Sequence, residues 1–99
     1  MNKPFYTEYV RHALRFYTRN LKVTEFKSES DRKNWLACAS VLGEYSDKQM
    51  NMLIEVYQGF DTLADNVYLA SKAYDINQGV LWDLMKEVER KIARKRGLI

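Results

Sequence analysis

Residues that interrupt helices are confined to five positions in this chain of 99 residues, namely Pro4, Gly43, Gly59, Gly79 and Gly97. The other positions are rich in residues that favour helices, and apolar residues recur three and four positions apart. Pro4 suits the first turn of a helix, where its missing N–H is not needed. The sequence therefore predicts an all-α fold.

Apolar spacing and capping residues divide the chain into five expected helices, which together form a single domain of residues 1–99. The expected helices cover, in chain order, about residues 4–19, 30–43, 46–59, 62–74 and 78–96. Ser46 and Gln49 have the spacing of a capping box, and Asp61 and Asn77 are the expected N-caps of the last two helices. The expected buried side chains of the third helix are those of Met50, Leu53, Ile54 and Tyr57.

The net charge of +3 is unevenly distributed along the chain. Residues 1–22 carry five basic residues against one acidic residue, and residues 86–99 carry six against two. Residues 46–85 carry two basic residues against six acidic ones. A chain with basic ends and an acidic middle is expected to bind a polyanion or an acidic partner.

Several classes of protein are disfavoured by what the sequence lacks. One cysteine, Cys38, cannot form an internal disulfide, and no apolar run reaches the length of a bilayer span, so we expect a cytoplasmic protein that does not enter membranes. His12 has no companion at metal-ligand spacing, so no metal site is expected. Without a glycine-rich phosphate loop or a catalytic motif, we expect neither an enzyme nor a bound cofactor.

The stretch from Val67 to Leu84 has the pattern of two helices joined by a tight turn. An apolar residue followed by a small one, Ala70-Ser71, lets a second helix cross the first closely. Asp75 occupies a turn position that requires left-handed backbone, which aspartate tolerates better than most residues. The spacing fits a helix-turn-helix, the arrangement that places its second helix in a DNA groove.

Further motifs flank this pattern. Before the two helices come Leu42, then a polar helix start with the sequence SDKQ, and then an apolar run with the sequence MLIEVY. The pair Thr62-Leu63 leads directly into the two helices, and a basic tail with the sequence ERKIARKRGL follows them. With these motifs, the stretch from Leu42 to Leu98 resembles the C-terminal, promoter-binding region of bacterial sigma factors and the small sigma-like regulators of phages and mobile elements. The resemblance implies a helix-turn-helix over about 62–96 that binds DNA in transcription regulation.

The resemblance also implies which residues contact bases, at the exposed N-terminal face of the second helix. Carried over to this chain, that face comprises Asn77, Gln78, Gly79, Trp82, Asp83 and Lys86. The side-chain amides of Asn77 and Gln78 suit adenine, and Lys86 suits a phosphate or guanine. Asp83 departs from this pattern, because a carboxylate repels phosphates unless it accepts a hydrogen bond from cytosine.

Two rows of basic residues have helical spacing. Arg90, Lys91, Arg94 and Lys95 recur at i, i+4 in the last helix, and such a row is expected to hold DNA phosphates. Arg11, Arg15 and Arg19 form a second row in the first helix. Beside aromatic residues they would suit single-stranded nucleic acid, but we favour the interpretation that their methylene groups cover the edge of the core.

The sequence thus predicts double-stranded DNA as the partner, with RNA polymerase and a second copy of the chain open as further partners. The alternative is a helical protein–protein adapter or self-associating module without DNA binding. The acidic middle of the chain favours that alternative, and so does Trp82, which lies beside the apolar stripe of its helix and is a candidate dimer contact.

Overall fold

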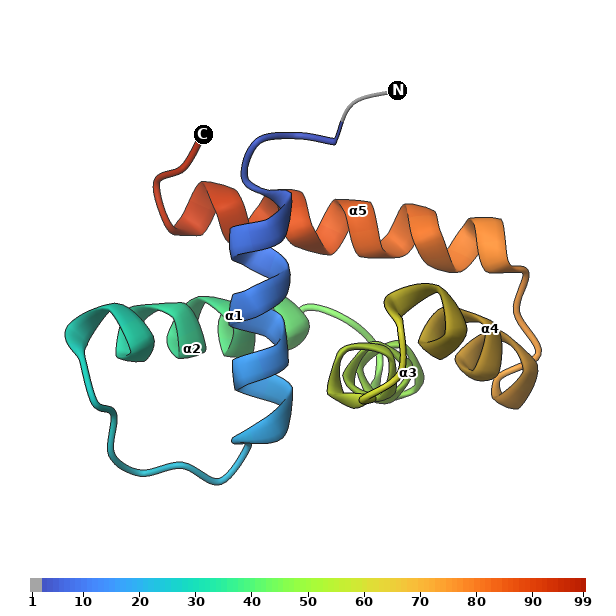
Figure 1. Cartoon of the computed structure of the whole chain (residues 1–99), viewed down its shortest axis with the longest axis horizontal. Coiled ribbons are helices and arrows are strands. Elements are labelled where there is room, and N and C mark those ends of the chain that lie inside the picture. The colour runs from blue at the N-terminus through green and yellow to red at the C-terminus, as the bar shows by residue number, and fades with distance from the viewer. Residues whose placement is uncertain (1–2) are drawn as a thin grey trace.

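The computed structural model describes residues 3–99, which form five α-helices and no strand (Figure 1). The helices are α1 (Thr7–Arg19), α2 (Glu29–Leu42), α3 (Asp47–Gln58), α4 (Leu63–Ala73) and α5 (Gln78–Lys95). The predicted all-α fold is therefore confirmed, as is the number of helices.

Side-chain caps explain where four of the helices begin. Ser28, Thr62 and Asn77 each accept hydrogen bonds from backbone N–H groups in the first turns of α2, α4 and α5. Ser46 and Gln49 form the predicted capping box of α3, in which each side chain bonds to the other residue's backbone N–H.

Two predicted helix starts are wrong. Pro4 lies outside α1, because its carbonyl accepts a hydrogen bond from the N–H of Thr7 in a turn that precedes the helix. Thr62, not Asp61, caps α4, and its hydroxyl accepts from the N–H of Asp65 at 3.2 Å. Either residue type makes a good N-cap, so their order in the sequence could not distinguish them.

α5 is the element that joins the two halves of the molecule. It packs against α1, α2 and α4, while α3 packs against α1 and α4. Figure 1 shows α1 crossing the C-terminal half of α5, with α4 beneath the N-terminal end of α5. The connection between α1 and α2, residues 20–28, lies at the edge of the molecule away from α5 in this view.

All five helices contribute to one core of buried apolar side chains. Its fully buried members include Val10, Leu14, Cys38, Leu42, Leu53, Val56, Val67, Leu81, Met85 and Val88. The predicted face of α3 is partly wrong, because Met50 and Ile54 are only half-buried, while Met52 and Val56 are buried. Since α3 packs against both α1 and α4, its buried face is turned from the one that the spacing predicts.

Candidate functional site

The turn between α4 and α5 reverses the chain through one left-handed residue. Asp75 has φ +51°, the conformation expected for it from its position. The N–H of Ile76 donates to the carbonyl of Ser71 at 3.0 Å, and the N–H of Asp75 donates to Lys72 at 3.4 Å. This pair of bonds is a Schellman motif, which satisfies the last carbonyls of α4 and determines the direction in which α5 leaves the turn.

The first turn of α5 begins directly after this motif and is exposed. The side-chain oxygen of Asn77 accepts hydrogen bonds from the N–H of Gly79 at 2.7 Å and of Val80 at 3.3 Å, which confirms the predicted N-cap. Gln78 and Gly79 are exposed, and Val80 retains 54% of its surface. The helix thus presents a capped, solvent-facing N-terminal turn.

α4 is tied to the end of α3 by a residue that the sequence analysis missed. The buried side chain of Asn66 donates to the carbonyls of Val56 at 3.0 Å and Gly59 at 3.2 Å. A Cβ atom on Gly59 would lie 2.6 Å from the side-chain oxygen of Asn66, so the contact requires glycine. These bonds determine how α4, and therefore the turn after it, sits on the rest of the protein.

A buried ion pair connects α1 to α5. The Nε of Arg11 donates to Glu89 at 2.9 Å, and the hydroxyl of Tyr57 donates to the same carboxylate oxygen at 2.6 Å. Glu89 is only 3% exposed. Burial and the neighbouring carboxylate raise the pKa of Tyr57 well above its ordinary value, so the phenol stays protonated and remains a donor.

The position of Glu89 had a signal in the sequence. It lies four residues after Met85 and three residues before Ile92, and both of these are buried on the apolar stripe of α5. A carboxylate on such a stripe requires a buried partner, and the remote Arg11 supplies it.

Trp82 and its neighbours on α5 differ in exposure. The ring of Trp82 is half-buried against the core, and the guanidinium carbon of Arg11 lies 5.9 Å from its centroid. Asp83 and Lys86 are exposed. α1 therefore lies against the middle of the face expected to contact bases, and the residues of that face nearest the turn remain open.

The basic residues at the end of α5 divide into two groups. Lys91 pairs with Glu44 at 3.3 Å and Glu87 at 3.4 Å. Its interaction with Tyr45, and after that the two carboxylates, raise the pKa of its ammonium group. The others, Lys86, Arg90, Arg94 and Lys95, are exposed, and within residues 3–99 none of them forms an ion pair. The predicted row therefore lacks a free cation at Lys91.

Two of the three arginines of the row in α1 form hydrogen bonds with other parts of the protein. Arg11 holds Glu89, and Arg19 donates to the carbonyls of Gln58 and Gly59 at 3.3 and 3.0 Å. The guanidinium of Arg19 also lies 4.1 Å from the ring centroid of Phe60. The guanidinium groups of these two arginines are therefore held by other parts of the protein.

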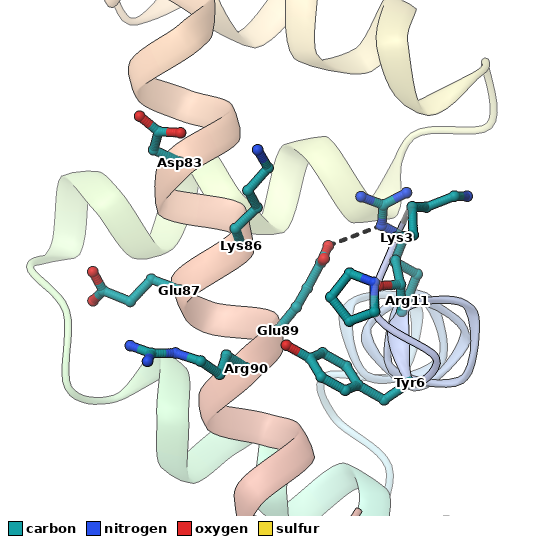
Figure 2. A pocket seen from close by; sticks show the side chains of 10 residues that line it. Lys3, Tyr6, Arg11, Asp83, Lys86, Glu87, Glu89 and Arg90 are labelled. Atoms are coloured by element: carbon teal, nitrogen blue, oxygen red, sulfur yellow. Dashed lines mark hydrogen bonds and ion pairs between the residues drawn. The ribbon is translucent and has the colours of Figure 1, made fainter. Parts of the chain in front are cut away.

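A groove of about 600 Å³ runs between α5 and the segment that precedes α1 (Figure 2). Its lining residues include Lys3, Pro4, Tyr6, Arg11, Asp83, Lys86, Glu87, Glu89 and Arg90. Figure 2 shows Asp83 and Glu87 directed to the opposite side of α5 from Arg11, whose guanidinium lies on the α1 side of the groove. The groove therefore has the carboxylates of Asp83 and Glu87 on one flank and Arg11 on the other.

No family model, curated protein or solved structure matches this chain.

In the part of the chain that the structure describes, no helix combines the length and apolar character needed to cross a bilayer. Nor do three His, Cys, Asp or Glu side chains of residues 3–99 gather where they could hold a metal ion. Burial raises the pKa of the Cys38 thiol to about 12, which keeps it protonated and unreactive.

Proposed function

We propose that this chain is a DNA-binding transcriptional regulator, with a sigma-like helix-turn-helix of phage or mobile-element type formed by α4 and α5. The proposal rests chiefly on the exposed first turn of α5, which follows the left-handed turn at Asp75 and is capped by Asn77. A helix N-terminus presented in this way is what major-groove recognition requires.

Within that turn, Gln78 is the residue proposed to contact a base. Bidentate pairing with adenine needs both the oxygen and the nitrogen of a side-chain amide. The oxygen of Asn77 already accepts two backbone hydrogen bonds, so Asn77 supports the helix instead. Gln78 is exposed, and its side chain makes no hydrogen bond within residues 3–99. Gly79 would let the DNA approach the backbone closely.

The row Lys86, Arg90 and Arg94 supplies the phosphate contacts in this proposal. These cations are spaced four residues apart along α5 and are free of ion pairs within the described chain. Lys95 extends the row, whereas Lys91 is already neutralised by two carboxylates. Since each phosphate contact releases counterions, binding should weaken steeply as salt rises.

The test is selection of binding sites from a random duplex library at two salt concentrations. We expect salt-sensitive binding and an enriched motif, and Gln78→Ala should lower the preference at one base pair by about ten-fold or more. Lys27→Ala is a control outside the proposed surface and should leave the selected motif unchanged, since Lys27 is exposed in the connection between α1 and α2, away from α5. Absence of binding at low salt would contradict the proposal.

The second candidate function is a protein–protein adapter, and one surface favours it. Phe60 is 87% exposed and Leu69 is 56% exposed, and the two line a hollow between α3 and α4. Glu55 and Asp61 line the same hollow, so a basic, apolar segment would suit it. Trp82 is a weaker candidate contact because its ring is half-buried. If the protein binds no DNA and Leu69→Asp abolishes a protein complex, the adapter function would replace the first proposal.

A further inference from the structure

We propose that Arg11, a residue of α1, holds a phosphate of the DNA backbone together with Lys86 of α5. This inference rests on the proposed function, and it extends the DNA-binding surface beyond the helix-turn-helix. It assigns the N-terminal half of the chain a part in binding.

The guanidinium of Arg11 has donors to spare. Only its Nε is used, in the bond to Glu89, and within residues 3–99 neither Nη group makes a hydrogen bond. The side chain keeps 14% of its surface, and the buried polar side-chain atoms of the described chain all have partners, so the Nη groups meet solvent. A planar fork of free N–H donors matches the oxygens of a phosphate.

The same contacts hold the group in place before any ligand arrives. Glu89 is itself fixed by the hydroxyl of Tyr57, and the ring of Trp82 lies beneath the guanidinium at 5.9 Å. A long side chain that is already ordered loses little further entropy on binding, which favours affinity. A mobile surface arginine would lose more side-chain entropy when it binds, and this loss would reduce the affinity of the complex.

Lys86 supplies the second cation. It lines the same groove as Arg11 and is exposed, and no carboxylate within the described chain pairs with it. The neighbouring carboxylates Asp83 and Glu87 lie on the side of α5 away from Arg11 (Figure 2). On the α1 side of the groove, an anion would therefore meet Arg11 and Lys86 and only one carboxylate that lines the groove, the already paired Glu89. Lys3 also lines the groove, and its ammonium group pairs with Glu8 at 2.6 Å.

The alternative is that Arg11 serves only to neutralise Glu89. The double variant Arg11→Gln/Glu89→Gln separates the two roles. It removes both charges, so the net charge of the protein is unchanged and no buried charge is left without a partner. The two amides and Tyr57 can still form hydrogen bonds, and thermal unfolding monitors the fold.

The measurement is the slope of log K against log salt for binding to the selected duplex. Loss of one phosphate contact should reduce its magnitude by about 0.9 in the double variant. Lys86→Gln should have a similar effect, and adding it to the double variant should change the slope little further, because the phosphate is held only when both side chains are present. In the wild-type protein, the Nε–H NMR resonance of Arg11 should shift when duplex is added.

An unchanged slope in a folded double variant would overturn the inference while leaving the proposed function intact, provided that Gln78→Ala still alters the selected motif. If the double variant does not fold, an Arg11 resonance that fails to shift would overturn it. If the wild-type protein shows no salt-dependent binding, the proposed function fails, and this inference fails with it.

Discussion

The arginines of α1 and the basic residues of α5 have the same spacing but different surroundings. In α1, Arg11 and Arg19 donate to a buried carboxylate and to the end of α3. In α5, Arg90 and Arg94 are exposed and form no ion pair within residues 3–99. Spacing alone therefore places cations on one side of a helix. What faces that side decides which of the cations also stabilise the fold.

The largest expected effect is on the stability of the α1 side. Arg11→Ala would leave the buried carboxyl group of Glu89 without its ion-pair partner and with only Tyr57 as a donor. We expect the free energy of unfolding to fall by about 3–5 kcal/mol, as measured by urea denaturation. Arg94→Ala is the matched control in α5 and should change stability by less than about 0.5 kcal/mol. Similar losses of stability in the two variants would contradict the claim that the arginines of α1 stabilise the fold and those of α5 do not.

A second prediction concerns the site where Arg19 meets the end of α3. In Gly59→Ala, the new methyl group would displace the side chain of Asn66, which bonds to the carbonyls of Val56, Gly59 and Asp61. Loss of these buried bonds should cost about 1–3 kcal/mol, measured in the same way. Gly97→Ala is a useful contrast, because nothing lies within 4 Å of its added Cβ and only its φ of +73° opposes the substitution. A neutral Gly59→Ala would show that Asn66 does not fix α4.

The third prediction separates support of α5 from contact with DNA. Asn77→Ala removes the acceptor for two backbone N–H groups and should lower stability by about 1 kcal/mol. Gln78→Ala, one residue later, should leave thermal stability nearly unchanged and reduce binding to the selected duplex. If Gln78→Ala destabilised the protein as much as Asn77→Ala, the assignment of separate roles would be wrong.

These contrasts show which features a sequence of this kind reveals. The capping box at Ser46, the N-cap at Asn77 and the left-handed Asp75 were predictable, because each is satisfied by atoms within a few residues. The choice of Thr62 over Asp61 was not, since adjacent residues compete for one cap.

Long-range pairing was the part of the site that could not be predicted. Arg11 and Glu89 are 78 positions apart, and Lys91 and Glu44 are 47 apart. Their pairing depends on how α1, α5 and the turn between α2 and α3 pack together, and local spacing carries no information on that packing. The same packing buries Met52 in place of Met50. The sequence therefore located the basic residues, and the fold decides which of them stay free.

Removal of the free cations of α5 should have the smallest effect on stability, and it tests most directly whether these cations bind DNA. Arg90→Gln/Arg94→Gln removes two free cations from α5, and Lys22→Gln/Lys27→Gln removes two exposed cations from the connection between α1 and α2. Both pairs should leave the protein folded and lower its net charge equally.

The measurement is the salt dependence of duplex binding by these two variants and the wild type. We predict that the α5 variant reduces the magnitude of the slope of log K against log salt by about 1.8, corresponding to two phosphate contacts, while the control variant leaves it unchanged. Equal slopes in all three proteins would contradict the claim that the exposed basic row of α5 binds DNA.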